Sequence, residues 1–295
     1  MNCLIGGLWP NLFRKFNSVR LSILAIALGV SVTGLSVVQA EERLLTIGGA
    51  ITETIYDLGL GSQVVAVDSS SLYPEAATKL PQVGYERTLS AEGVLGLRPS
   101  LILATSDAGP KEVTEQIRNA GVKFVSIQAD PGVEGAKRKI QAIADAVGKS
   151  AAGKEMTAKI DAQIATLPPA KPIARRPKIL FIYARGGGTL NVSGTGTAAH
   201  AMIEAAGGRN AVTEYKNYQP LTAESAVRAA PDIILLTSRG LESIGGIDQL
   251  LKSPGLAETP AGRARRVVVM DDLKLLGFGP RTGEAVAELT AELQK

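Results

Sequence analysis

Cysteine and histidine are nearly absent from this sequence of 295 residues, which holds one of each. Cys3 lies in a leader-like amino-terminal segment, so residues 41–295 offer no disulfide, no thiolate metal site and no cysteine nucleophile. His200 lies in the helical pattern of residues 197–206, among small and apolar residues, and we expect it to have a structural role. A single imidazole excludes a metal site built from several histidines, and no serine-nucleophile motif accompanies it.

The excess of basic over acidic residues is small, and aromatic residues are few. The formal net charge is +4, from 32 basic and 28 acidic residues. Arg14, Lys15 and Arg20 lie in the first 40 residues, which contain no acid, so the rest of the chain has 29 basic and 28 acidic residues. The basic excess therefore belongs to the leader and indicates no nucleic-acid-binding face. The nine scattered aromatics of residues 41–295 form no stacking platform for single strands.

One hydrophobic run stands out, at residues 21–32. The basic segment 1–20 precedes it, and Val38-Gln39-Ala40 follows it. This order predicts a secretory signal peptide, residues 1–40, that is cleaved after Ala40. The length of the basic segment leaves an uncleaved membrane anchor as the alternative. An exported chain of this size without cysteine is typical of a bacterial periplasm, which is where we expect the protein.

Short apolar segments alternate with helical patterns along residues 41–295. This alternation predicts an α/β fold with parallel sheets and helices on both faces. The expected strands are residues 44–47, 64–67, 101–103, 123–127, 178–183, 233–236 and 267–270. The expected helices are residues 51–58, 90–96, 111–120, 197–206, 222–229 and 284–293.

An internal repeat favours two lobes. Residues 89–106 match residues 221–238 without gaps, at an offset of 132 residues. The matched positions include a helix-capping serine or threonine, the acids Glu92 and Glu224, and the proline before each strand. A repeat of this period in an α/β chain predicts two Rossmann-like lobes of similar topology.

A single helix is expected to join the lobes. Apolar residues recur on one helical face between the two lobes, namely Met156, Ile160, Ile164 and Leu167. We therefore expect an N-terminal lobe (41–147), a connecting helix (148–170) and a C-terminal lobe (171–295). The alternative is an ordinary helix of one lobe. A rigid helical connector permits only small closure around a ligand.

The residues that directly follow the strands are the candidates for a binding site, because the carboxyl ends of the strands in two facing lobes meet at a common cleft. These segments are residues 48–49, 69–87, 105–106, 185–188, 215–219 and 238–240. Residues 194–199, Gly-Thr-Gly-Thr-Ala-Ala, formally match a dinucleotide-binding motif, although the strand before them is short. A secreted dinucleotide-dependent oxidoreductase is therefore the alternative outside the class of binding proteins.

Tyr85 is the candidate ligand for iron. It lies on the loop that leads to the capped helix at Ser90, and Arg87 follows two residues later. A phenol ligates ferric iron as the phenolate, which both the iron and a nearby guanidinium stabilise. Tyrosine is a known axial ligand of haem iron. The residues alone also allow a loop tyrosine that only packs.

Residues 80–103 resemble the haem-ligand segment of periplasmic haemin-binding proteins. Their sequence is Leu-Pro-Gln-Val-Gly-Tyr-Glu-Arg-Thr-Leu-Ser-Ala-Glu-Gly-Val-Leu-Gly-Leu-Arg-Pro-Ser-Leu-Ile-Leu. These are the substrate-binding components of bacterial haem ABC importers. Further similarity lies in residues 197–210, 237–242 and 278–282, and the resemblance covers residues 43–295. It implies a two-lobe, helix-linked fold, ferric haem as the transported ligand, and no catalysis.

The resemblance also implies roles for four cleft residues. Tyr85 would be the axial ligand, and Arg87 would pair with its phenolate oxygen. Arg239 would face the haem from the opposite wall. Arg185 stands where some relatives carry a histidine that can ligate a second haem, and we therefore expect one haem.

Two further residues are implied to meet a partner. Glu92 and Glu224 would dock to arginines of the transporter's membrane subunits. Favourable electrostatics at a helix N-terminus accounts for both acids equally well. With the resemblance, we expect a monomeric periplasmic carrier that delivers haem to an inner-membrane ABC permease, downstream of an outer-membrane haem receptor. A carrier of a ferric siderophore or a corrinoid is the alternative in the same class.

Overall fold

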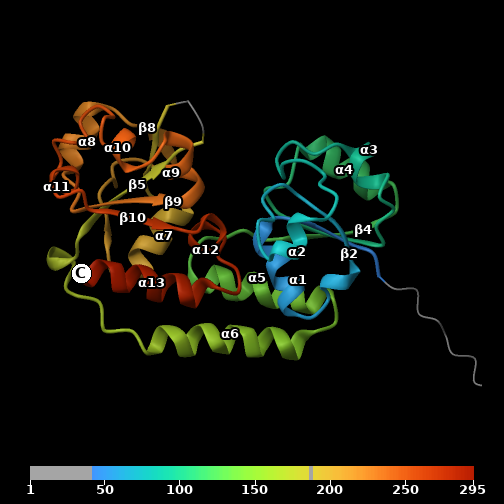
Figure 1. The fold of residues 1–295 in the computed structure, drawn as a ribbon. Coiled ribbons are helices and arrows are strands. Elements are labelled where there is room, and N and C mark those ends of the chain that lie inside the picture. The colour runs from blue at the N-terminus through green and yellow to red at the C-terminus, as the bar shows by residue number, and fades with distance from the viewer. Residues whose placement is uncertain (1–41, 186–188) are drawn as a thin grey trace, which may run out of the picture. The chain divides into compact units, whose positions relative to one another are not determined.

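Two β-sheets with parallel centres, each covered by helices on both faces, organise the computed structural model (Figure 1). The structure describes residues 42–185 and 189–295, and residues 41–295 form one unit. The expected signal peptide lies outside the described residues. Within the described ranges, no helix combines the length and the apolar character needed to cross a bilayer.

The N-terminal lobe is built on a four-stranded sheet of order β2-β1-β3-β4 in which every pairing is parallel. Its strands are β1 (Leu44–Ile47), β2 (Val64–Val67), β3 (Leu101–Thr105) and β4 (Lys123–Ile127). Its helices are α1 (Gly49–Asp57), the 3₁₀ turn η1 (Gly61–Gln63), α2 (Glu75–Thr78), α3 (Ala91–Leu95), α4 (Lys111–Asn119) and α5 (Val133–Ala146). The four strands lie where the sequence pattern predicts them.

The C-terminal lobe has a six-stranded sheet with the path β10-β9-β5-β6-β8, and β7 pairs with β5. Its strands are β5 (Lys178–Tyr183), β6 (Asn191–Ser193), β7 (Arg209–Asn210), β8 (Tyr218–Pro220), β9 (Ile233–Thr237) and β10 (Val267–Met270). Its helices are the 3₁₀ turn η2 (Ile173–Arg175), α7 (Ala198–Ala205), α8 (Ala223–Ala229), α9 (Ser238–Ile244), α10 (Ile247–Leu250), α11 (Pro260–Arg263), α12 (Asp272–Leu276) and α13 (Thr282–Gln294).

The central strands of each sheet are buried on both faces. In β3, Leu101 and Leu103 belong to one apolar cluster, and Ile102 and Ala104 belong to the cluster on the other face. The strand β9 divides its side chains between two clusters in the same way. Helices on both faces of a parallel sheet require this pattern, which explains why the strands read as continuous apolar runs in the sequence.

The repeat is visible in the backbone. The helices α3 and α8, and the strands β3 and β9, begin at the same offset of 132 residues, and a side-chain cap opens each helix. The residues before the two matched prolines, Arg98 and Ala230, both adopt a left-handed conformation, with φ of 47° and 42°. This conformation is uncommon for residues other than glycine. The two lobes therefore share a local backbone path, as the sequence repeat predicts.

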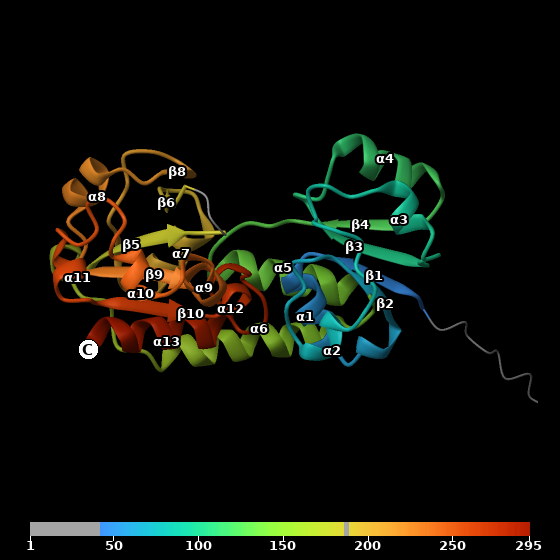
Figure 2. The same ribbon diagram turned by 45° about the horizontal axis from the view of Figure 1, so that its top comes forward.

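One long helix, α6 (Ser150–Ala165), runs below both lobes (Figure 2). Its Met156 packs against the core of the N-terminal lobe, and Ile164 packs against that of the C-terminal lobe. The helix α5, which was not predicted from the sequence, also contributes to both cores, through Ile143 in the N-terminal lobe and Ala136 in the C-terminal lobe. The fold class predicted from the sequence is thus confirmed, but two helices rather than one tie the lobes together.

The edge of the C-terminal sheet differs from the prediction. The strands β6 and β8 pair antiparallel with their neighbours, and the sequence pattern indicated only parallel strands. Strands of three residues are too short for an alternation of side chains to be recognised. Because β6 leads into Gly194 and α7, the glycine motif follows an antiparallel strand and not the parallel strand of a dinucleotide-binding unit.

Candidate functional site

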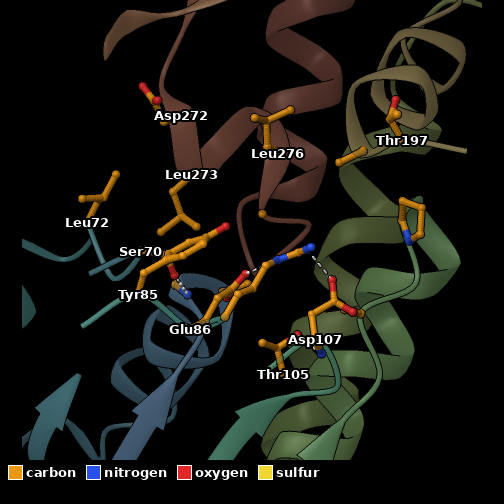
Figure 3. Close-up of a pocket in the computed structure, with 18 of the residues that line it drawn as sticks. Ser70, Leu72, Tyr85, Glu86, Thr105, Asp107, Thr197, Asp272, Leu273 and Leu276 are labelled. Carbon is orange, nitrogen blue, oxygen red and sulfur yellow. Dashed lines mark hydrogen bonds and ion pairs between the residues drawn. The ribbon is translucent and has the colours of Figure 1, made fainter. Parts of the chain in front are cut away.

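A cleft of about 1110 Å³ lies between the two lobes, and residues of both lobes line it. Each of the segments predicted to follow a strand contributes to its wall, except that Gly186–Gly188 lie outside the described residues. The cleft also takes in Lys139 from α5 and the leucines Leu273 and Leu276 from α12. Figure 3 shows these two leucines in the same cavity as Tyr85 and Glu86.

The loop that carries Tyr85 is tied to its surroundings by backbone hydrogen bonds. The N–H of Ser69, just after β2, donates to the carbonyl of Gly84 at 2.8 Å, and the N–H of Gly109 donates to the carbonyl of Glu86 at 2.8 Å. Gly84 has a φ of 91°, which a residue with a side chain rarely adopts. The half-buried ring of Tyr85 therefore enters the cleft from a fixed loop.

Arg185 of the C-terminal lobe reaches across to Tyr85 of the N-terminal lobe. Its guanidinium carbon lies 5.5 Å from the centre of the Tyr85 ring and 5.6 Å from that of Tyr183. Both distances suit a cation–π contact. The cleft thus has a cation against the face of the proposed iron ligand, supplied by the opposite lobe.

Arg87 is engaged differently from the pairing that the resemblance implies. Its Nη2 lies 2.6 Å from Oδ2 of Asp107, and its Nε lies 3.8 Å from Oε1 of Glu86. Figure 3 shows both acids, with dashed lines marking these interactions. Among the described residues, Arg87 makes no hydrogen bond to the Tyr85 hydroxyl. The pairing of Arg87 with a phenolate remains a prediction.

Of the other residues singled out from the sequence, Arg239 lines the cleft, and Glu92, Glu224 and His200 do not. Arg239, in the first turn of α9, lines the cleft, and its backbone N–H donates to Oδ2 of Asp272 at 3.0 Å. Glu92 and Glu224 are exposed in the first turns of α3 and α8, and they do not line the cleft. His200 contributes to α7, where its Nδ1 lies 3.4 Å from Nδ2 of Asn210.

A buried polar network supports the wall next to Tyr85. The carboxylate of Asp68 is fully buried and accepts hydrogen bonds from the N–H groups of Gly48 and Ser70, each at 2.9 Å. It also accepts a hydrogen bond from the hydroxyl of Ser71 at 2.8 Å. These bonds fix the turn after β1 against the loop after β2, and both of these segments line the cleft.

Burial changes the ionisation of several cleft groups. Desolvation raises the pKa of Glu86, and the nearby carboxylate of Asp68 raises it further. Desolvation lowers the pKa of Lys139 to about 8. Desolvation also raises the pKa of Tyr183, and it raises that of Tyr218 to about 12. Tyr183 and Tyr218 are therefore poor sources of a phenolate at neutral pH.

Lys139 was not predicted as a site residue, although the sequence pattern of its helix marks it as unusual. It lies in α5 between Ala136, Ile140 and Ile143, all of which are fully buried. The spacing places the lysine on the apolar face of the helix, where an amine is unexpected. An amphipathic pattern with a lysine on its buried face indicates a functional or a paired cation.

The donor set limits the kind of metal that the site can hold. Within residues 42–185 and 189–295, no three His, Cys, Asp or Glu side chains come together as a metal-binding group. Common protein sites for bare metal ions use several such donors. A metal that an organic ring already chelates needs only an axial donor, and a single tyrosine hydroxyl can supply it.

The sequence model of the family described as "Periplasmic binding protein" matches residues 45–273. The chain belongs to the periplasmic binding protein family. Members of this family bind substrates for transport and are not enzymes, so the protein is a binding protein located outside the cytoplasm.

Solved structures of the family are similar over nearly the whole described chain. The periplasmic heme-binding protein RhuT from Roseiflexus sp. RS-1, in its apo form, is 45% identical with a TM-score of 0.81, and the match covers 86% of this chain and 98% of that one. The periplasmic heme-binding protein BhuT in complex with two hemes is 42% identical with a TM-score of 0.79, and the match covers 85% and 97%.

A corrinoid-binding relative is also similar in sequence. The cobalamin-binding protein of Halobacterium salinarum is 26% identical over 266 residues, which is 87% of this chain and 70% of that protein. This periplasmic binding protein is thus similar to carriers of two kinds of metal-containing macrocycle.

Proposed function

We propose that the protein binds ferric haem in the cleft between its lobes and delivers it to an ABC permease of the inner membrane. Tyr85 carries the proposal, because its side chain enters the cleft from a fixed loop and has a guanidinium against its ring. Haem has a broad apolar face and two carboxylates, and the cleft offers both leucines and arginines. Similarity to RhuT and BhuT supports haem as the ligand.

We expect the protein to bind one haem, with Tyr85 as the axial ligand and with Arg239 and Arg185 facing the porphyrin from the other lobe. Arg185 stands where the sequence resemblance places a second ligating histidine in some relatives. A guanidinium stays protonated in proteins and does not ligate iron. BhuT, whose solved structure holds two hemes, defines the competing stoichiometry.

Titration of the purified protein with haemin, followed by absorption spectroscopy, tests this proposal. We expect a saturable Soret change, a phenolate-to-iron charge-transfer band and an end point at one haemin per chain. A parallel titration with cyanocobalamin tests the alternative that the ligand is a corrinoid, which the similarity to the Halobacterium protein favours. Saturable binding of the corrinoid together with no haemin binding would contradict the haem assignment, and an end point of two would contradict the stoichiometry.

Residues 1–40 would act as a cleaved export signal for a monomeric carrier that works downstream of an outer-membrane haem receptor. The basic segment followed by an apolar run supports this part of the proposal. Amino-terminal sequencing of the exported protein tests the cleavage, with Glu41 as the expected first residue.

Glu92 and Glu224 are our candidates for permease docking. Both are exposed, and in Figure 1 the helices α3 and α8 that carry them lie at the ends of their lobes away from α6. Glu224 pairs with Arg228 at 3.0 Å, and an exposed ion pair of this kind contributes little to the stability of the fold. One acid in each of two similar lobes suits a partner with twofold symmetry.

Charge reversal tests the docking residues. The double variant Glu92→Lys/Glu224→Lys should bind haem normally but lower haem uptake through the native permease about tenfold, since like charges now face each other. Glu284→Lys, in the first turn of α13, is the matched control and should leave uptake unchanged, because α13 lies beside α6 at the other end of the molecule in Figure 1. Full uptake by the double variant would remove these acids from the docking face.

A further inference from the structure

Lys139 differs from the other cations of the cleft because it is buried. It is 9% exposed, and it lines the cleft at its base, where α5 meets the end of α12. Its Nζ donates to the carbonyl of Gly277, in the C-terminal lobe, at 2.9 Å. An ammonium has three N–H donors, and within the described ranges this is the one hydrogen bond that it makes.

The acids around Lys139 already have arginine partners. Glu86 and Asp107 are paired with Arg87, at 3.8 and 2.6 Å. Asp130 pairs with Arg138 at 3.1 Å. In the part of the chain that the structure describes, no carboxylate lies within 4.0 Å of the Lys139 ammonium.

A buried cation without an adjacent anion is unfavourable, because burial removes its hydration. The same desolvation lowers the pKa of Lys139 to about 8, so the amine is still mostly protonated at neutral pH. An anion that enters the cleft would meet an ammonium that has unused donors and little exposure to solvent. Charge-assisted hydrogen bonds are strongest in such surroundings.

We propose that Lys139 binds an ionised carboxylate of the ligand at the base of the cleft. This inference rests on the proposed function, in which the carboxylates are the propionates of haem. Lys139 would then also help to determine which macrocycle the cleft accepts. The acetamide and propionamide side chains on the rim of a cobalamin carry no charge, and its one anionic group, a phosphodiester, lies in the nucleotide loop. A cation that meets the rim of the bound macrocycle, as we propose for Lys139, therefore favours a carboxylated macrocycle over a corrinoid.

The proposal is tested by measuring four dissociation constants. Wild-type protein and Lys139→Met are each titrated with haem and with haem dimethyl ester, in which both propionates are methyl esters. Loss of a charge-assisted hydrogen bond should weaken haem binding by Lys139→Met about tenfold or more. Binding of the diester should change less than twofold, because it has no carboxylate to lose. Lys154→Met, on the exposed face of α6, is the matched control and should leave all constants unchanged.

A structural role predicts a different pattern. If Lys139 acts only by holding Gly277, its substitution weakens haem and diester binding equally, and the proposal is overturned. Unchanged haem binding overturns it as well. Lys139→Gln, which can still donate to Gly277 without a charge, provides a second variant should methionine prevent folding. Failure of wild-type protein to bind either form of haem would instead refute the proposed function.

Discussion

Substituting Tyr85 with phenylalanine should lower the affinity for haem about 100-fold or more, a loss of about 2.7 kcal/mol or more. The phenolate-to-iron charge-transfer band should disappear at the same time. Phenylalanine keeps the ring that packs against Arg185 and removes only the oxygen, so the change isolates ligation from packing. Absorption titration of the variant with haemin measures both effects.

Tyr56→Phe is the control for this substitution. Tyr56 lies in α1 of the same lobe and does not line the cleft, so its variant should bind haem with the wild-type spectrum. Thermal unfolding of both variants establishes that the fold is retained. If Tyr85→Phe keeps the band and the affinity, another residue ligates the iron and the site described above is wrong.

Substituting Arg281 with methionine should reduce the free energy of unfolding by about 3–5 kcal/mol. Arg281 lies just before α13, and its Nε and Nη2 bind the carboxylate of Glu53, in α1 of the other lobe, at 2.7 and 3.1 Å. Glu53 is 2% exposed, so the variant leaves a buried carboxylate without its partner. Chemical denaturation at neutral pH measures the loss.

The loss should shrink as the pH falls. Desolvation raises the pKa of Glu53 above its ordinary value of 4.5, and removing the guanidinium takes away the main opposing effect. Between 4.5 and the raised pKa, the folded variant binds more protons than the unfolded chain, so acidification stabilises the folded state in this window. A loss that is constant from pH 7 to pH 5 would contradict this account.

Two further variants test whether the loss of stability comes from the unpaired carboxylate of Glu53. Arg138→Met breaks the exposed pair with Asp130 and should cost less than about 1 kcal/mol. The double variant Glu53→Met/Arg281→Met removes the buried carboxylate together with its partly buried partner and should recover most of the stability, since an apolar pair can replace such an ion pair. A double variant as unstable as Arg281→Met would show that Arg281 acts through other contacts, such as its 3.9 Å approach to the Tyr73 ring.

The candidate site could be located from the sequence because parallel strands place their carboxyl ends at one edge. The segments that contain Tyr85, Arg185 and Arg239 were located in this way, and the resemblance singled out the two arginines. The structure places all three residues on the cleft wall. The contacts among them could not be predicted. Arg87 is two residues from Tyr85 yet pairs with Asp107, whereas Arg185, one hundred positions further along the chain, lies over the tyrosine ring.

By itself, the sequence determined the parallel strands, the capped helices that precede β3 and β9, and the two matched lobes, because backbone preference and side-chain periodicity are properties of neighbouring residues. Only the tertiary structure decided that Glu53 meets Arg281, that Lys139 lies at the base of the cleft, and that short antiparallel strands extend the second sheet. These features join residues far apart in the chain. Their energies depend on how the lobes exclude water from between them, and no local pattern encodes that.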